Sequence, residues 1–303
     1  MSDYHRPVLL TESVDLLNIQ EGGIYVDVTF GGGGHSKEIL SRLGHGQLIT
    51  FDRDPDAQRN LPQDERVVFV ANDFQFIEEE LKARGVTAVN GVLADLGVSS
   101  HQFDTAERGF SYRFSGPLDM RMNPTHGQTA AELIQEADED ELAALFRTYG
   151  EVPNSRKLAR TIVQGRSGRL IQSTEELVEI VRPCVPPKRG AKYLAQVFQA
   201  LRIEVNNEMR SLEKLLMGGL EMMAENGRFV IIAYHSLEDR MVKHFFRSGN
   251  FAGKVEKDFY GNPLTPWKMI TRKAIQADEP EVAENPRARS ARLRAVEKCT
   301  ETR

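Results

Sequence analysis

The chain has 303 residues, of which 40% are hydrophobic and 27% charged, and this composition is ordinary for a globular protein of about two domains. A net charge of −5 argues against a protein that coats nucleic acid through bulk charge, although local basic patches remain compatible with it. The two cysteines, Cys184 and Cys299, lie far apart and exclude a disulfide scaffold. The first residues lack a signal-peptide pattern, and the most apolar run, 229–234, is too short to cross a bilayer. We therefore expect a cytoplasmic protein without a membrane partner.

Strand and helix patterns alternate over the first hundred residues, which predicts a parallel α/β sheet. A helix is expected after Gly31–Gly34, with Ile39, Leu40 and Leu43 on its apolar face. A doubly wound sheet of this kind binds its ligands at the carboxyl ends of the strands. Strands are predicted at residues 24–30, 47–52, 66–71 and 89–95.

The pattern changes after residue 103. A loop rich in Gly, Pro, Arg and Met covers 104–127, and helical segments then follow one another until a fifth strand at 228–235. Asn154 is placed to cap one helix and Ser173 to open another with a capping box, while a long helix is expected from Ala191 to Val205. We predict a discontinuous α/β domain, 1–103 with 206–303, interrupted by an all-helical insertion over 104–205.

Four consecutive glycines between a strand and a helix allow a tight turn and a close approach to a ligand. The loop does not match GxGxxG, because Ser36 falls at the last position, and no GxxxxGK[ST] occurs. A nucleoside cofactor held without a phosphate cradle is one interpretation, and a surface turn is the other. Asp52 follows the second strand about 20 residues later, where an acid accepts both ribose hydroxyls.

These features resemble the S-adenosylmethionine-dependent methyltransferase sheet, and longer motifs narrow the resemblance. From His5 to Lys298 the sequence is similar to the bacterial small-subunit ribosomal RNA cytosine-N4 methyltransferase family, MraW or RsmH. The resemblance implies a Rossmann-like sheet with a helical insertion, S-adenosyl-L-methionine as cofactor, and N4-methylation of a cytidine in the decoding centre (P site). It also implies 16S rRNA as partner, within the 30S subunit or a late assembly intermediate. The matching motifs are 5–10, 29–36, 95–100, 107–110, 116–122, 198–203, 235–240 and 284–290.

The resemblance also implies a set of cofactor contacts. The glycine loop would receive the methionine portion, Asp52 the ribose, and Asp95 would lie beside the sulfonium. Phe74 would stack on adenine, although an ordinary core aromatic is the alternative; Gln102 is chosen through the resemblance alone. The chain departs from the family at Gly32, Asn90 and Ala94, and the role of 250–268 is left open. The full implied set is Gly33, Gly34, His35, Asp52, Phe74, Asp95 and Gln102.

The catalytic residue is not assigned by the sequence. Many amino-methyltransferases carry Asp/Asn-Pro-Pro-aromatic after the fourth strand, whereas this chain has Asp-Leu-Gly-Val at 95–98. Asp95 and His235 are the candidates for bonding the cytosine amino group, because each ends a central strand; His235 is equally well explained as a structural histidine. No histidine or cysteine spacing typical of a metal site occurs, so we expect no metal.

Basic residues are concentrated in the predicted insertion. Residues 153–192 hold nine of them against three glutamates, a local charge of +6. They would grip RNA phosphates or form a solvated helix face. A small-molecule methyltransferase with a helical lid and an inactive ribosome-assembly factor are the alternative functions. The C-terminal part adds a second basic group: Arg287, Arg289, Arg292, Arg294 and Lys298.

Overall fold

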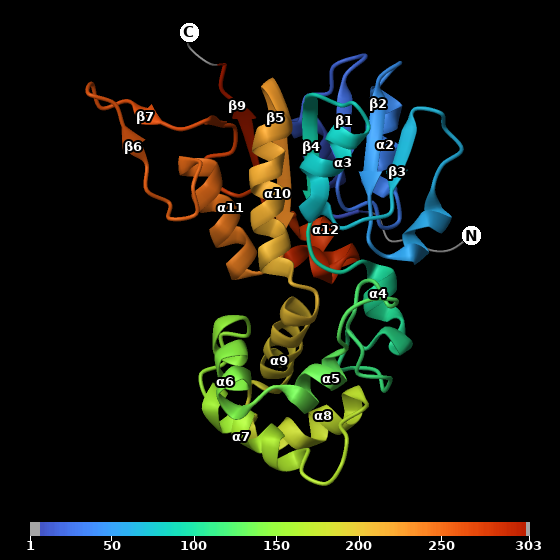
Figure 1. The fold of residues 1–303 in the computed structure, drawn as a ribbon, viewed down its shortest axis with the longest axis vertical. Coiled ribbons are helices and arrows are strands. Elements are labelled where there is room, and N and C mark those ends of the chain that lie inside the picture. Colours follow the sequence, from blue (N-terminus) through green and yellow to red (C-terminus); the bar gives the residue numbers. More distant parts are fainter. Residues whose placement is uncertain (1–6, 301–303) are drawn as a thin grey trace. The chain divides into compact units, whose positions relative to one another are not determined.

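The computed structural model describes residues 7–300 and divides into two compact units (Figure 1). The first unit runs to Gly97 and resumes at Met209, and the second is Val98–Glu208. The predicted insertion, 104–205, falls inside the second unit. His5 and Arg6, which open the first sequence motif, lie outside the described residues. Within 7–300, no helix has the length and apolar character needed to span a membrane.

The first unit is built on a seven-stranded sheet in the order β3-β2-β1-β4-β5-β9-β8. Strands β1 to β5 pair in parallel, and β9 pairs antiparallel with both β5 and β8. The predicted α/β class and its five parallel strands are confirmed, whereas β8 and β9 were not predicted. The strands are β1 (Ile24–Asp27), β2 (Gln47–Phe51), β3 (Val67–Val70), β4 (Val89–Asp95), β5 (Met223–Ala233), β8 (Trp267–Met269) and β9 (Arg292–Lys298).

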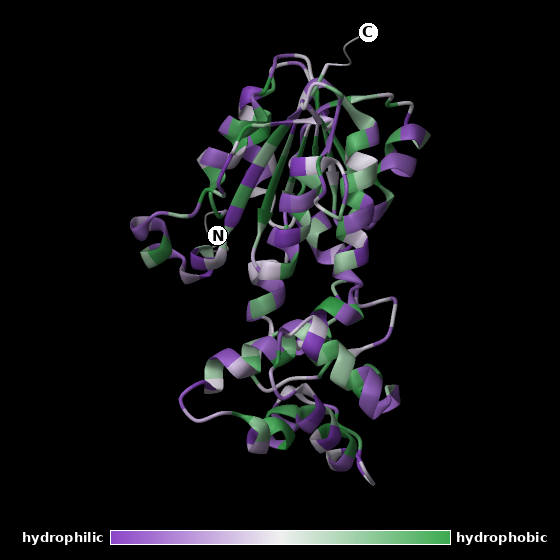
Figure 2. Ribbon diagram, turned by 90° about the vertical axis from the view of Figure 1, so that its left-hand side faces the viewer, coloured by the Kyte–Doolittle hydropathy of each residue, from purple (hydrophilic) through white to green (hydrophobic). Residues whose placement is uncertain are grey.

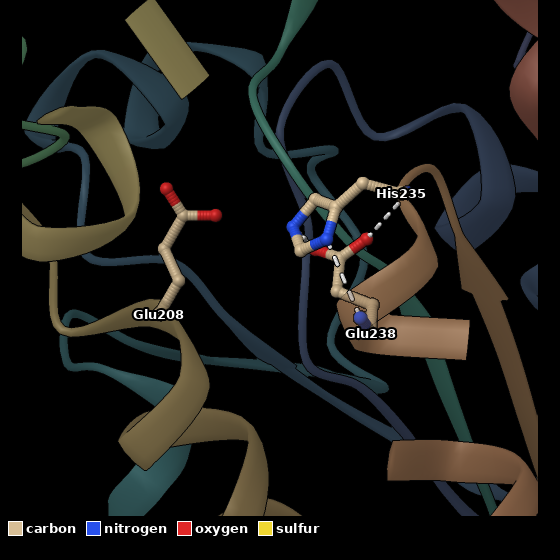
Figure 3. Close-up of side chains that lie close together, drawn as sticks. All are labelled: Glu208, His235 and Glu238. Carbon is tan, nitrogen blue, oxygen red and sulfur yellow. Dashed lines mark hydrogen bonds and ion pairs between the residues drawn. The ribbon is translucent and has the colours of Figure 1, made fainter. Parts of the chain in front are cut away.

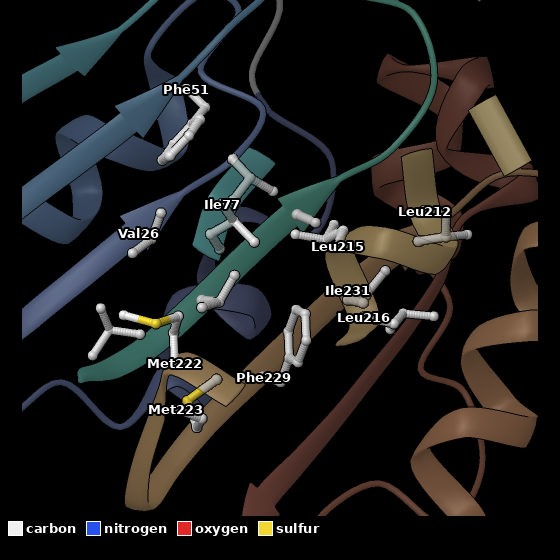
Figure 4. Packing of buried hydrophobic residues seen from close by; sticks show 14 of the residues in the cluster. Val26, Phe51, Ile77, Leu212, Leu215, Leu216, Met222, Met223, Phe229 and Ile231 are labelled. Carbon is white, nitrogen blue, oxygen red and sulfur yellow. The ribbon is translucent and has the colours of Figure 1, made fainter. Parts of the chain in front are cut away.

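Helices cover both faces of this sheet because successive strand residues point to opposite sides. Tyr25 packs with α1 (Leu10–Leu17) and α2 (Gly34–Arg42), while its neighbour Val26 packs with α3 (Ile77–Ala83), α10 (Glu208–Met222) and α11 (Ser236–Ser248). Figure 4 shows the second of these clusters, and Figure 2 shows hydrophobic residues running along the strands. The remaining segments are η1 (Pro55–Asn60), η2 (Phe74–Phe76), α12 (Glu279–Glu284), η5 (Pro286–Ser290) and the hairpin β6 (Glu256–Lys257) with β7 (Pro263–Leu264).

The second unit is helical, and residues 98–208, all of which the structure describes, contain no strand. Its core includes Leu142 and Phe146, as their spacing predicts. Ser173 forms the predicted capping box with Glu176. Asn154 stands at the predicted N-cap position, but its side chain forms no capping bond: the amide instead donates to the Cys184 carbonyl and accepts from the Tyr193 hydroxyl. The helices are α4 (Ser100–Asp104), η3 (Ala106–Arg108), α5 (Ala130–Glu136), α6 (Glu139–Thr148), α7 (Ser155–Gly165), α8 (Thr174–Val181), η4 (Arg182–Cys184) and α9 (Gly190–Val205).

Candidate functional site

Polar side chains gather where the parallel strands of the first unit end. Asp27 is the last residue of β1, Asp52 follows β2, Asp95 ends β4, and Tyr234 follows β5. Because β2, β1, β4 and β5 are neighbours in the sheet, these four residues lie together along the edge formed by the carboxyl ends of the strands. This is the edge at which open α/β sheets bind ligands.

The glycine loop after β1 is fastened to Asp52 and η1. The amide of Gly31 donates to Asp52 Oδ2 at 2.8 Å, and the side-chain amide of Asn60 donates to the Gly31 carbonyl at 2.9 Å. Gly33 has a φ of 75°, in the left-handed region, and a Cβ there would lie 3.0 Å from the Phe30 ring. A larger residue at 33 would therefore be strained by both backbone and neighbour.

Gly34 is required by the chain's own packing. A Cβ on Gly34 would lie 2.1 Å from Cγ of Pro7. His35, the next residue, is buried and places Nε2 3.2 Å from the Val8 carbonyl oxygen. A carbonyl oxygen only accepts, so Nε2 is the nitrogen that carries hydrogen in this contact. These contacts account for a glycine at 34 without a ligand; the cofactor contacts of Gly34 and His35 remain predictions.

Asp52 has the geometry expected of a hydroxyl acceptor. Its Oδ2 accepts from Gly31 and its Oδ1 accepts from the Asp54 amide at 2.8 Å, and the side chain is half-buried. Burial raises the pKa of Asp52 to about 6, against the lowering effect of the Asp54 and Gly31 amides. Each carboxylate oxygen accepts more than one hydrogen bond, so capacity for two ribose hydroxyls is left.

Asp95 forms two hydrogen bonds and faces a buried histidine. Its amide donates to Thr29 Oγ1 at 2.7 Å, and its Oδ1 accepts from the Tyr234 hydroxyl, also at 2.7 Å. Its Oδ2 faces His35 Nδ1 at 3.8 Å, which is beyond hydrogen-bond distance. Burial raises the pKa of Asp95 to about 6, opposed by His35 and the Tyr234 hydrogen bond. With 23% of its side chain exposed, Asp95 remains accessible at the strand edge.

Three further polar residues of this edge were missed by sequence reasoning. Asp27 is 1% exposed and accepts from the Ser36 hydroxyl at 2.6 Å and from the Thr29 amide at 3.1 Å. Burial raises the pKa of Asp27, with His35 acting in the opposite direction. An acid inside the apolar run 24–30 was a readable signal, because buried carboxylates are rare. Tyr234 and Thr29 carried no comparable signal.

His235 caps the helix that follows β5. Its Nδ1 accepts from the Glu238 amide at 3.3 Å, and Glu238 Oε2 accepts from the His235 amide at 3.3 Å (Figure 3). With Nδ1 accepting, the neutral ring carries its hydrogen on Nε2, which lies 3.2 Å from Glu238 Oε1. Glu208, also drawn in Figure 3, belongs to the second unit and pairs with Arg202 at 2.7 Å. The capping contacts favour the structural interpretation of His235.

Phe74 and Gln102, the remaining predicted contacts, lie in different units. Phe74 opens η2 after β3 and is half-buried against the sheet core. Gln102 is a buried residue of α4 in the second unit, where its Oε1 accepts from the Ser99 amide at 3.0 Å. That bond completes a capping box, a local reason for glutamine at this position. Their contacts with a cofactor remain predictions.

Most of the basic group in the second unit is exposed. Arg166 is the exception: it is half-buried, and its Nη1 donates to the carbonyls of Ile134 and, at 2.7 Å, Ala137. A phosphate contact of this residue remains a prediction. The exposed members are Arg156, Lys157, Arg160, Arg169, Arg182, Lys188, Arg189 and Lys192.

Two members of the basic group near the C-terminus bind partners within the first unit. Arg294 is buried and pairs with Asp239 at 2.7 Å, and Lys298 donates to the Leu220 and Met223 carbonyls. Both residues belong to β9, so their side chains join the sheet to its helices. The prediction of a phosphate contact is wrong for the buried Arg294, and for the half-buried Lys298 it remains a prediction.

Comparisons with known proteins agree with the motifs. The pattern of the MraW methylase family matches residues 2–299. Ribosomal RNA small subunit methyltransferase H of Bacteroides fragilis strain YCH46 is 53% identical over 296 residues, 97% of each chain. The protein of that name from Flavobacterium johnsoniae is 52% identical over 98% of each chain. An rRNA methylase structure from Streptococcus thermophilus has a TM-score of 0.45 at 9% identity, covering 98% of this chain and 99% of that one. The chain belongs to the MraW methylase family.

Proposed function

We propose that this protein transfers a methyl group from S-adenosyl-L-methionine to N4 of a cytidine in the decoding centre (P site) of 16S rRNA. The substrate is the 30S subunit or a late assembly intermediate, and the reaction takes place in the cytoplasm. The observation that carries the proposal is the edge bearing Asp52 and Asp95 in a chain half identical to small-subunit rRNA methyltransferases.

The glycine loop fits the methionine portion of the cofactor, and Asp52 fits its ribose. The loop is pinned beside Asp52 with Gly32 exposed, which leaves backbone accessible next to an acceptor of two hydroxyls. The half-buried Phe74 offers a ring for adenine. When bound, S-adenosyl-L-methionine supplies a methyl group on a positively charged sulfur, and transfer requires alignment with the attacking nitrogen.

Asp95 is the residue of this edge best suited to the cytosine amino group. The nitrogen's lone pair is delocalised into the ring, and an acceptor that bonds its N–H makes the lone pair more available. With a pKa of about 6, Asp95 is mostly ionised at neutral pH and is therefore an acceptor. Tyr234 and Thr29 fix its orientation from β5 and β1, so Asp95 meets the substrate with little reorganisation.

The second unit supplies the basic surface that we propose binds RNA. Lys188, Arg189 and Lys192 are exposed, and none forms an ion pair with any residue that the structure describes. Such side chains bind phosphates and release counterions. This exposed basic surface disfavours a small uncharged substrate. The intact Asp52–Gly31 and Asp95–Tyr234 contacts disfavour an assembly factor without catalysis.

The test is nucleoside mass spectrometry of 16S rRNA after incubating undermethylated 30S particles with the protein and isotope-labelled cofactor. We expect one labelled N4-methylcytidine per particle, at a position that oligonucleotide mapping assigns to the P site. Label on another base or position contradicts the specificity proposed. Absence of label from 30S particles, late assembly intermediates and naked rRNA alike contradicts the activity itself.

A further inference from the structure

A short hairpin between α11 and β8 carries two aromatic rings that the described part of the chain leaves uncovered. Strands β6 and β7 pair antiparallel, and their connecting turn holds Phe259 and Tyr260 with 98% and 86% of their surfaces exposed. Figure 1 shows the hairpin (orange) extending away from α11 and the sheet. Exposed aromatic side chains presented together mark binding surfaces more often than isolated exposed residues do.

The turn is ordered by its own hydrogen bonds. The Asp258 carboxylate accepts from the Tyr260 amide at 2.8 Å and from the Asn262 amide and side chain at 2.8 and 2.9 Å. Gly261, with a φ of 88°, donates to the Asp258 carbonyl at 3.0 Å. The two rings stand 5.5 Å apart at 87°. Their faces therefore point in different directions, and each can take a separate flat partner.

The size of this surface favours a nucleic acid. Lys254 and Lys257 are exposed and have no ion-pair partner within residues 7–300, although Glu256 and Asp258 bring the formal charge of the segment to zero. Leu264, 55% exposed, adds the hairpin's other large apolar side chain. A stable protein interface buries about 800 Å² on each partner, far more than a five-residue turn provides. Bases, by contrast, bind single aromatic rings by stacking.

We propose that this hairpin binds unpaired nucleotides of RNA, with Phe259 and Tyr260 each stacking on a base and the lysines meeting the flanking phosphates. The assignment of RNA as the substrate rests on the proposed function. Trp267, just after the hairpin, pairs with Lys298, whose neighbour Glu297 pairs with Arg228 of β5. The hairpin thus joins the sheet at the end of the strands opposite to the end that carries Asp95. It therefore contributes to RNA affinity and leaves the transfer step unchanged.

The experiment uses the full chain with a single-stranded 12-nucleotide oligouridine and an RNA duplex of equal length. Phe259→Ala with Tyr260→Ala should weaken oligouridine binding by about tenfold or more, since each base–aromatic stack contributes measurably to affinity. Duplex binding should change little. On 30S particles the same variant should raise KM and keep kcat. Because both rings are exposed, its thermal melt should match that of the parent chain.

Single substitutions separate stacking from general apolar contact. Phe259→Trp should keep oligouridine affinity and show quenched emission on binding, against a constant background from the buried Trp267. Phe259→Leu should lose affinity although it remains apolar. Met217→Ala, at a 57% exposed position on α10, is the matched control and should bind as the parent does.

Unchanged oligouridine affinity in the double variant overturns the inference, and so does a leucine variant that binds as well as the tryptophan variant. A defect confined to 30S particles, with oligouridine binding intact, assigns the hairpin to a protein partner and also overturns it. The proposed function is judged separately: ring-dependent oligouridine binding without methyl transfer would leave this inference standing and remove the activity.

Discussion

Asp52 and Asp95 are two carboxylates whose pKa the fold raises to about 6, yet both keep hydrogen-bond donors at close range. Burial raises both pKa values, and the Asp54 and Gly31 amides at Asp52 and His35 and the Tyr234 hydroxyl at Asp95 oppose it. With pKa values of about 6, both carboxyls are mostly charged at neutral pH. The two acids are therefore available as acceptors in a site that is partly withdrawn from water.

For Asp52, we expect Asp52→Asn to weaken cofactor affinity while the fold persists. Replacing one acceptor oxygen by an amide leaves a ribose hydroxyl without a partner, at a cost of about 1–3 kcal/mol. Calorimetric titration with S-adenosyl-L-methionine measures it, and Glu65→Gln, an exposed acid of the same unit, is the control. Equal affinity in the two variants would remove Asp52 from the site.

For Asp95, we expect Asp95→Asn to lower kcat more than it raises the cofactor KM. An acceptor for the amino group acts in the transition state, whereas a cofactor ligand acts mainly on ground-state binding. Single-turnover rates at saturating cofactor make the comparison. Transfer at the parental rate would exclude the acceptor role and leave His235 as the next residue to test.

The raised pKa of Asp95 also predicts a pH-dependent stability. An acid that binds its proton more tightly when folded favours the folded state while protonated. That contribution is complete below about pH 4 and is lost as pH rises through about 6. The free energy of unfolding of Asp95→Asn minus that of the parent should therefore increase by about 1 kcal/mol from pH 5 to pH 8. Urea unfolding at both pH values measures the difference, and a constant difference contradicts the expectation.

Asp52 was predictable as a site candidate because it follows an apolar strand about 20 residues after the glycine loop. Asp95 was predictable because it ends an apolar strand and opens the motif 95–100. Tyr234 and Thr29 were not, since their importance comes from reaching Asp95 across the sheet, and cross-strand distances are absent from a linear pattern. Gly34 also has a packing role that the sequence did not indicate, because the residue it accommodates, Pro7, lies 27 positions earlier.

At the scale of elements, the basic turn before α9 is the part of the second unit open to a direct test. Lys188→Ala with Arg189→Ala should flatten the dependence of RNA affinity on salt, because fewer counterions are released. Cofactor affinity should be unchanged. Lys82→Ala with Arg84→Ala, whose charges pair with Glu78 and Glu80 on α3, is the matched control. An equal salt slope in both variants would identify the basic turn as solvated surface.

The two strands that the sequence did not predict, β8 and β9, both depend on partners that are distant in the sequence. β9 carries arginines and lysine that look like a solvated tail, but Arg294 is neutralised by Asp239 and the strand lies between β5 and β8. β8 is three residues long, and its Trp267 packs against Phe229, which is distant in sequence. In both strands tertiary partners override the local pattern, whereas β1 to β5 are apolar enough to be recognised alone.

At the scale of the whole molecule, hydrogen exchange shows which backbone amides are protected when the cofactor binds. Saturating S-adenosyl-L-methionine should slow amide exchange at Gly31–His35 and around Asp52 in the first unit. If Gln102 contacts the cofactor, protection extends to α4 in the second unit, while α7 and α8 keep their rates. Protection confined to the first unit would remove Gln102 from the cofactor contacts, and no protection at the glycine loop would contradict its role.

In the sequence the second unit lies between β4 and β5, and this order determines when each strand of the sheet is synthesised. At ~5–20 residues per second, the hundred or so residues of Val98–Glu208 take roughly 5–20 s to synthesise. Throughout that interval β4 has emerged and β5 has not, so the nascent sheet ends in an apolar strand with an unpaired edge. The inserted segment is contiguous and can pack while the ribosome is still translating, but the sheet waits for its fifth strand. The exposed edge of β4 is therefore where a holding chaperone would bind this chain during translation, and where aggregation would begin without one.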